Sequence, residues 1–399
     1  MFTKQRSNVE YAALLDVGSG SVTVSIVCSN QKTNKVEMVW THHERLLLKQ
    51  VVRQNAEKPI LTSVLNCLLT LSSEGILALR GYDKGAQLRT IQVGVSAPWT
   101  YTVTKTVRLK KDKPFLIKRS TIDDLRDAAE EKIRTEINEN EIAQELELVV
   151  VTRSITEMRA NDYPFIPKNN HRASSLSMTL SSVIIQNHLH HALIEGCEKI
   201  LPNAQIQMYS SMLQTYFTLR DMYPEMREFC IVIPTLEATE IGLVRNGVLT
   251  YSTHEPYGIA HIAKDISEAL NTPIGEVYGQ LQADELTIQN DTLSQKAKAV
   301  VTEVFGVYRK RLVELFKQTG DDFTIPRSMF VLKTGRSQQP LVQHIEAAAE
   351  TSTGFKHIVH PIIDGLTLTP DAAVSDTSIE CVSGHFFHRF GFDTRFTFL

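Results

Sequence analysis

The turn at residues 16–21, which reads DVGSGS, contains the strongest candidates for chemistry in this sequence. Small residues at a hairpin tip let backbone N–H groups approach a phosphate, and an aspartate at the end of a strand can hold a hydrated Mg²⁺. The candidate phosphate-binding residues are Asp16, Gly18, Ser19, Gly20 and Ser21, and Asp16 is also the candidate metal ligand. An ordinary tight turn, in which the glycines supply positive φ, accounts for the same residues.

Other nucleotide and metal motifs are missing from the sequence. No G-x-x-x-x-G-K-[ST] occurs, and Thr23 stands where G-x-G-x-x-G needs its third glycine, which excludes the P-loop and the Rossmann fingerprint. His188, His190 and His191 lie together, but helical positions two apart point to different sides and no carboxylate or cysteine accompanies them at ligand spacing. We interpret these histidines as the start of a solvated helix.

The amino-acid composition limits which classes of protein this chain can belong to. The 399 residues are 42% hydrophobic and 22% charged, which is enough for a core and for two or three domains. The net charge of -3 provides no basic field for nucleic acid, so no nucleic-acid partner is expected. Five scattered cysteines without a C-x-x-C pair argue against disulfides and zinc and favour a reducing cytosol. No run of about 18 apolar residues occurs, so we expect a cytoplasmic protein that reaches the membrane indirectly, through partners.

The elements that must position the turn form a plan that occurs twice. Residues 12–29 predict a β-hairpin around the turn, and a strand at 35–42, a helix at 59–79 and a strand at 89–96 complete a ribonuclease-H-like half-domain. Residues 229–252 repeat the hairpin, with Asn246-Gly247 as a further turn of the favoured hairpin type.

Other segments predict additional elements. A strand at 101–109, a helix at 122–137 capped by Thr121, and a strand at 145–153 form a separate small unit, followed by a loop at 167–175. The remaining predictions are a strand at 176–185, a helix at 188–200, a helix at 298–317, a strand at 329–332 and a turn at 333–336. The tail at 385–399 has period two, which predicts an extended chain with four phenylalanines on one side: Phe390, Phe392, Phe396 and Phe398.

Three segments resemble the nucleotide motifs of the actin-like ATPase superfamily, within it the FtsA and PilM branch. LLDVGSGSVTVSIV is similar to phosphate 1, CIVIPTLEATEIGLVRNGVLTYSTHEPYGIAHIAKDI to phosphate 2, and FVLKTGRSQQPLVQHI to the adenosine motif. The resemblance implies an α/β, actin-like (duplicated ribonuclease-H-like) two-lobed fold with an inserted SHS2-like (1C) subdomain. The expected limits are 1–88 and 179–227 for lobe 1, 89–178 for the inserted subdomain, 228–350 for lobe 2, and 351–399 for a return to lobe 1 and a tail.

The resemblance also implies further nucleotide-binding positions, and it shows where this chain departs from the pattern. Glu240 matches the second acidic position of phosphate 2, while Gly335, Arg336 and Ser337 fall in the adenosine motif. The D-[IV]-G-G that opens phosphate 2 in the family reads IPTL at 233–236, so the carboxylate that orients Mg²⁺ or water is lost. We therefore expect a pseudo-ATPase that binds ATP and Mg²⁺ weakly or not at all, with no catalytic residues.

The function implied by the resemblance is a bacterial scaffold. A PilM-like protein would bind a cytosolic peptide of an inner-membrane protein in type IV pilus assembly, and an FtsA-like protein would bind a tubulin-like filament in cell division. The tail lacks the helical stripe of a membrane anchor, which favours the pilus role over the division role. A working ATPase of the same superfamily is the remaining alternative. The inserted subdomain could also mediate self-association, and its basic stretch at 108–119 is either a solvated edge or a site for an anionic partner.

Overall fold

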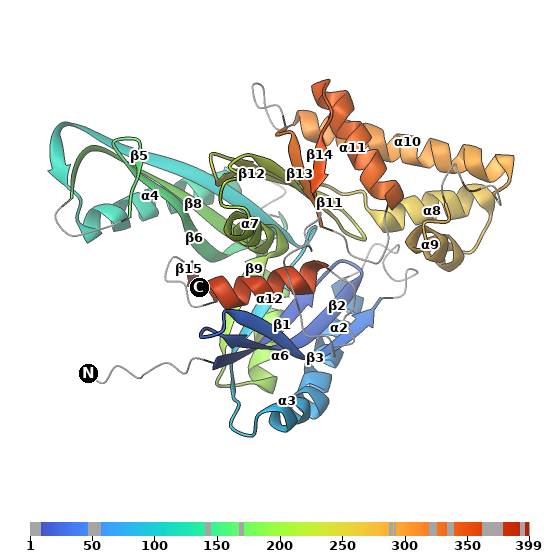
Figure 1. The fold of residues 1–399 in the computed structure, drawn as a ribbon, viewed down its shortest axis with the longest axis horizontal. Coiled ribbons are helices and arrows are strands. Elements are labelled where there is room, and N and C mark those ends of the chain that lie inside the picture. Colours follow the sequence, from blue (N-terminus) through green and yellow to red (C-terminus); the bar gives the residue numbers. More distant parts are fainter. Residues whose placement is uncertain are drawn as a thin grey trace.

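The computed structural model contains three β-sheets that extend in three directions from a central pair of helices (Figure 1). The structure describes residues 9–46, 57–139, 145–166, 171–286, 290, 293–318, 325–332, 339–360, 378–391 and 396–398. The mixed α/β architecture with a repeated sheet plan and an added third sheet is the fold class expected from the sequence.

The first sheet contains the turn at residues 16–21. Its strand order is β3 (Lys35–Arg45), β2 (Ser21–Asn30), β1 (Val9–Val17), β4 (Leu88–Val95) and β9 (Gln205–Ser210). The predicted hairpin is confirmed, because β1 pairs antiparallel with β2 and Asp16 lies opposite Thr23. Strand β4 runs parallel to β1 on its other side, and β9 runs parallel to β4.

Helices cover one face of this sheet. The predicted helix at 59–79 is α2 (Glu57–Thr70), a π-helical turn η1 (Leu71–Gly75) and α3 (Ile76–Tyr82), and α6 (Asn187–Ile200) packs beside α2. The apolar side of α2 supplies Ile60, Val64 and Leu68 to the main core. By length and composition the stretch Glu57–Tyr82 could cross a membrane, but its apolar side packs on the sheet and 39% of the relevant window is buried.

The second sheet repeats the plan of the first. Its order is β12 (Val248–Glu255), β11 (Thr239–Arg245), β10 (Phe229–Pro234), β13 (Ser328–Val331) and β14 (Ile358–His360). The turn between β11 and β12 has φ of +52° at Asn246 and +79° at Gly247, as a hairpin turn of this type requires. Four helices complete this lobe: α8 (Ile259–Leu270), α9 (Ile274–Gln282), α10 (Gln295–Lys317) and α11 (Gln339–Thr353).

The third sheet has a core of its own. Its order is β15 (Phe396–Phe398), β6 (Leu148–Ala160), β8 (Arg172–Gln186) and β5 (Thr100–Leu116), with β7 (Tyr163–Pro164) pairing with β6. Helix α4 (Arg119–Glu139) packs on the sheet through the predicted stripe that includes Leu125, Ala129 and Ile133.

The limits of this unit differ from the expected 89–178. Strand β4 belongs to the first sheet, and β8 continues to Gln186 because its last residues still pair with β5 and β6. The expected loop at 167–175 is wrong for residues 172–175, which start β8, and residues 167–170 lie outside the described part of the chain.

Two helices lie between the first and second sheets, α7 (Ser211–Met222) and α12 (Ser378–Phe390) (Figure 1). The prediction of an extended tail from 385 is wrong up to Phe390, which ends α12. The helix forms because Phe386 and Phe390, one turn apart, both pack on Phe217 of α7, while Phe387 packs on the first sheet. Among the described residues of the tail, Phe396–Phe398 is extended and pairs with β6, while Phe392 lies outside the described residues.

Candidate functional site

The turn between β1 and β2 is held by its own backbone. The Gly18 N–H donates to the Ser21 carbonyl at 2.9 Å, and the Leu46 N–H donates to the Gly20 carbonyl at 2.9 Å. The five candidate residues at 16–21 therefore share one hairpin tip, as the sequence predicts.

Asp16 is buried at this tip and already has a hydrogen-bond donor. Its side chain is only 6% exposed, and the Ser383 hydroxyl of α12 donates to its Oδ1 at 3.0 Å. Burial, with a smaller contribution from the nearby Glu380 carboxylate, raises the pKa of Asp16 to about 8, although the hydrogen bond from Ser383 acts in the opposite direction. Asp16 is consequently protonated at neutral pH, a state in which a carboxyl group is a poor Mg²⁺ ligand.

Gln214 and Gly94 complete the surroundings of Asp16, and the sequence analysis predicted neither of them. Gln214 of α7 places its Oε1 3.2 Å from the Ser383 hydroxyl. A Cβ on Gly94 of β4 would lie 2.6 Å from Asp16 Oδ1 and 2.8 Å from Gln214 Oε1, so this close approach requires glycine. Ser383 and Gln214 have no local sequence signal, because each reaches Asp16 only through the packing of α12 and α7.

The hairpin tip of lobe 1 contacts the corresponding turn of lobe 2 directly. The Glu237 N–H donates to the Ser19 hydroxyl at 3.0 Å. A Cβ built on Gly20 would lie 2.2 Å from Leu236 Cδ2 and 2.8 Å from Leu236 Cβ. Leu236 therefore fills the space directly over Gly20, between the two turns.

The second turn also uses the first amides of the helix that follows it. The Ile259 N–H donates to the Thr235 carbonyl at 3.2 Å, and the Ala260 N–H donates to the Leu236 carbonyl at 2.8 Å. Gly258 sits against this backbone, since a Cβ there would lie 2.6 Å from the carbonyl oxygens of Thr235 and Leu236. The first amides of α8 are thus satisfied by protein carbonyls and do not face an anion.

Of two carboxyl groups in the second hairpin, that of Glu240 is buried and that of Glu237 is half-buried. Glu240 of β11 is 2% exposed, and its Oε2 has no hydrogen-bond partner among the described residues. Burial raises the pKa of Glu240 to about 8 and that of Glu237 to about 7. If ionised, they would repel a triphosphate, and if protonated they would not attract Mg²⁺.

These observations decide whether the described residues fit a nucleotide and its metal. The turns touch, Leu236 covers Gly20, and Asp16 is buried and hydrogen-bonded, so this arrangement does not fit the phosphates of ATP or a bound Mg²⁺. Within the described ranges no group of three or more His, Cys, Asp or Glu side chains is placed to hold a metal ion. Gly335, Arg336 and Ser337 lie outside the described residues.

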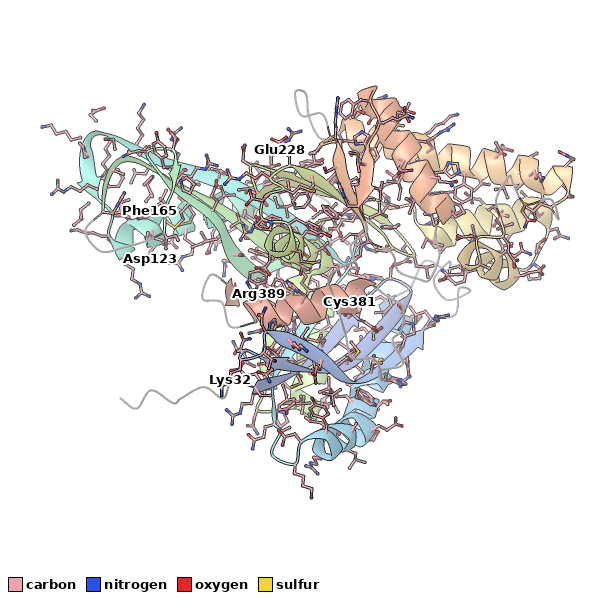
Figure 2. All side chains as sticks on the ribbon, in the orientation of Figure 1. Lys32, Asp123, Phe165, Glu228, Cys381 and Arg389 are labelled. Atoms are coloured by element: carbon pink, nitrogen blue, oxygen red, sulfur yellow. The ribbon has the colours of Figure 1, made fainter. Side chains whose placement is uncertain are left out.

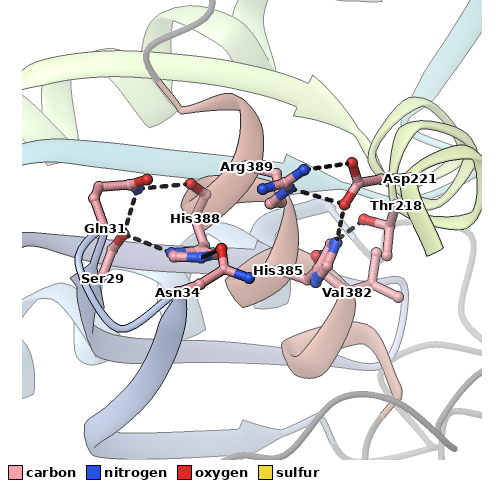
Figure 3. Close-up of polar contacts among 9 residues, drawn as sticks. All are labelled: Ser29, Gln31, Asn34, Thr218, Asp221, Val382, His385, His388 and Arg389. Carbon is pink, nitrogen blue, oxygen red and sulfur yellow. Dashed lines mark hydrogen bonds and ion pairs between the residues drawn. The ribbon is translucent and has the colours of Figure 1, made fainter.

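Helix α12, which carries Ser383, is fixed by polar contacts on two sides (Figure 3). On one side, the Asp221 carboxylate of α7 accepts two hydrogen bonds from Arg389, at 2.9 and 3.0 Å, and lies 3.1 Å from His385. On the other, the His388 ring lies 2.9 Å from the Ser29 hydroxyl and 3.1 Å from Asn34 Oδ1. Because α7 and the first sheet both hold this helix, the position of Ser383 against Asp16 depends on packing between segments far apart in the sequence.

Comparisons with solved structures identify the fold. The structure is similar to that of a PilM–PilN type IV pilus biogenesis complex, with a TM-score of 0.56 over 94% of this chain and 96% of that one, at 10% sequence identity. The ethanolamine utilization protein EutJ from Carboxydothermus hydrogenoformans matches with a TM-score of 0.43 over 97% of this chain and 92% of that one, at 10% identity. A protein of unknown function with an actin-like ATPase fold from Bacteroides thetaiotaomicron gives 0.41 over 90% and 94%, at 10% identity. No family model and no curated protein matches the sequence. The chain has the actin-like ATPase fold, with a PilM-like arrangement over most of its length.

Proposed function

We propose that this protein is a cytoplasmic, actin-fold scaffold of the PilM type, which binds a cytosolic peptide of an inner-membrane protein in type IV pilus assembly. The observation that carries the proposal is the similarity of the fold to the PilM–PilN complex, which extends over 94% of this chain and 96% of that one. Its association with the membrane would be made through that partner.

We further propose that the scaffold works without hydrolysing ATP. The support is the direct contact between the two hairpin turns, in which Ser19 accepts the Glu237 amide and Leu236 covers Gly20. Phosphoryl transfer depends on positioned metal and charge, and the buried, protonated Asp16 supplies neither. No observation favours the division protein or the working ATPase.

The partner is tested by titrating labelled cytosolic peptides from the inner-membrane pilus proteins of the same genome against the full chain. We expect saturable binding of at least one peptide, with an affinity that Mg-ATP does not change. Absence of binding to every pilus peptide, together with capture of a tubulin-like protein, would contradict the pilus role.

The nucleotide proposal has its own test, which combines calorimetry with Mg-ATP and a phosphate-release assay. We expect no measurable turnover, and the same result for Asp16→Ala and for the matched control Asp112→Ala on the exposed edge of β5. Turnover by the parent that is lost in Asp16→Ala and retained in Asp112→Ala would show that the chain is an ATPase.

A further inference from the structure

The free end of the third sheet combines exposed apolar side chains with unpaired cations. We call this region the sheet tip, defined as residues 108–119, 161–166 and 171–172. The third sheet points away from both lobes, so the sheet tip is one end of the molecule along its longest axis (Figure 1). Figure 2 shows side chains that end in nitrogen projecting outward from this end, close to Phe165.

Two large apolar side chains of the sheet tip are almost fully in water. Tyr163 is 76% exposed and Ile166 is 78% exposed, in the short segment that connects β6 to β8. Neither contributes to the core of the third sheet, which is closed beneath them by Phe165 and Met158. Side chains of this size are costly to leave exposed unless another surface covers them.

The same end carries cations without acidic partners. Residues 111–114 of β5 stand opposite Ser174 alone, so Lys111, Asp112 and Lys113 project from the strand as a bulge. The ion pairs of the third sheet use Lys105, Arg108, Arg153 and Arg159. The sheet tip has two exposed carboxylates, Asp112 and Asp162, and Asp162 is already paired with Arg108. Six exposed cations of the sheet tip make no ion pair with any described residue: Lys110, Lys111, Lys113, Lys118, Arg119 and Arg172.

Hydrogen bonds join the apolar and basic parts into one surface. Lys110 of β5 pairs with Ser175 of β8, and the carbonyl of Ser175 accepts the Asn161 N–H at 2.9 Å on the other side. Arg108 binds Asp162, the residue before Tyr163. The first carboxylate of α4, Asp123, is bonded to Arg126 of its own helix.

We propose that the sheet tip binds the surface of an anionic lipid bilayer. Tyrosine and isoleucine can enter the interfacial region of a membrane while neighbouring lysines remain at the headgroups, and each lysine gains from the negative surface potential. A planar surface can reach a projecting end of the molecule, and the contact would orient the long axis of the third sheet towards the membrane. This direct contact would act in addition to the membrane association made through the pilus partner, and it does not depend on the identity of that partner.

Binding to a bilayer explains more features of the sheet tip than protection of the sheet edge against strand pairing does. Lysines on an edge strand such as β5 also prevent unwanted strand pairing. That role explains Lys110, Lys111 and Lys113, but it gives no reason for Tyr163 of β7 or for Ile166, because neither lies on the free edge of β5.

The test is co-sedimentation of the full chain with vesicles of phosphatidylcholine alone or with added phosphatidylglycerol. We expect binding only to the anionic vesicles, weakened by salt. Each lysine near the membrane surface raises the binding constant for anionic vesicles by about fivefold. The triple variant Lys110→Glu, Lys111→Glu, Lys113→Glu should therefore bind about a hundredfold or more weakly than the parent. Tyr163→Ser with Ile166→Ser should reduce it by about tenfold, also at high salt, where the apolar part remains.

Two matched controls keep the test specific. Lys296→Glu, Arg309→Glu and Lys310→Glu make the same charge change on the exposed side of α10, and Leu69→Ser with Leu77→Ser removes exposed apolar side chains from α2 and α3. Both should bind as the parent does. The proposal is overturned if the parent does not bind anionic vesicles at low salt, if the sheet-tip variants bind them unchanged, or if the parent binds only an acidic polypeptide such as polyglutamate.

Discussion

The contact between Gly20 and Leu236 gives the sharpest test of the closed site. A methyl group added by Gly20→Ala would lie 2.2 Å from Leu236 Cδ2 and 2.8 Å from Leu236 Cβ, where unstrained carbon atoms are about 3.5–4.0 Å apart. The end of the leucine can rotate away, but its Cβ is fixed to the backbone, so the two turns must separate. We expect Gly20→Ala to lower the free energy of unfolding by about 1–3 kcal/mol, the usual cost of overpacking.

A double-mutant cycle shows whether this cost comes from Leu236. Leu236→Gly alone should cost about 2–3 kcal/mol, because it removes a buried leucine side chain and adds chain freedom in the turn. It also removes the three atoms that lie nearest to a Cβ on Gly20, namely Cδ2, Cβ and Cγ of Leu236, so the double variant should be about 1–2 kcal/mol more stable than the sum of the single changes predicts.

The assay is urea unfolding followed by circular dichroism. Gly306→Ala in α10 is the matched control, because a Cβ there meets nothing within 4 Å, and it should stabilise the protein by about 0.5–1 kcal/mol. Additive effects of the two single changes, within about 0.5 kcal/mol, would refute the turn-to-turn contact.

Two further predictions concern buried and paired carboxylates. The pKa of Asp16 is about 8 in the folded state and lies above its value in the unfolded chain. Between about pH 4 and pH 8 the folded state therefore keeps a proton that the unfolded chain releases, so the free energy of unfolding falls as the pH rises through this range. Asp16→Asn should flatten that part of the profile and be at least about 1 kcal/mol more stable than the parent at pH 8; parallel denaturation profiles would contradict this. Hydrogen bonds from His385 and Arg389 lower the pKa of Asp221 to about 2, so its contribution is present above about pH 4 and is lost as pH falls towards 2. Asp221→Asn should cost about 1–2 kcal/mol at pH 7, with the difference from the parent vanishing near pH 2 in thermal or urea unfolding; a difference that does not change with pH would argue against the ion pair.

Local sequence determined the strands and turns of this protein. The apolar runs on both sides of DVGSGS fixed the hairpin of β1 and β2, and the left-handed residues Asn246 and Gly247 fixed the turn between β11 and β12. The stripe that includes Leu125, Ala129 and Ile133 predicted α4, because a helix that covers a sheet repeats its apolar residues every three to four positions. Such patterns depend on neighbours within one turn or one hairpin, so they can be read without knowing the fold.

The state of the candidate site depended on contacts between distant segments. Asp16 is buried because α12, with Ser383 367 positions away, and Gln214 of α7 close over it, and this burial raises its pKa. Gly20 is covered because Leu236 comes from the other lobe. The tail shows the same limit: Phe390, Phe392, Phe396 and Phe398 have the period of a strand, but α12 forms up to Phe390. A period of two shows only which side chains would share a face if the chain were extended. Whether this segment is a helix or a strand depends on the apolar surface that α7 and the first sheet offer, and a helix buries Phe386, Phe387 and Phe390 against that surface.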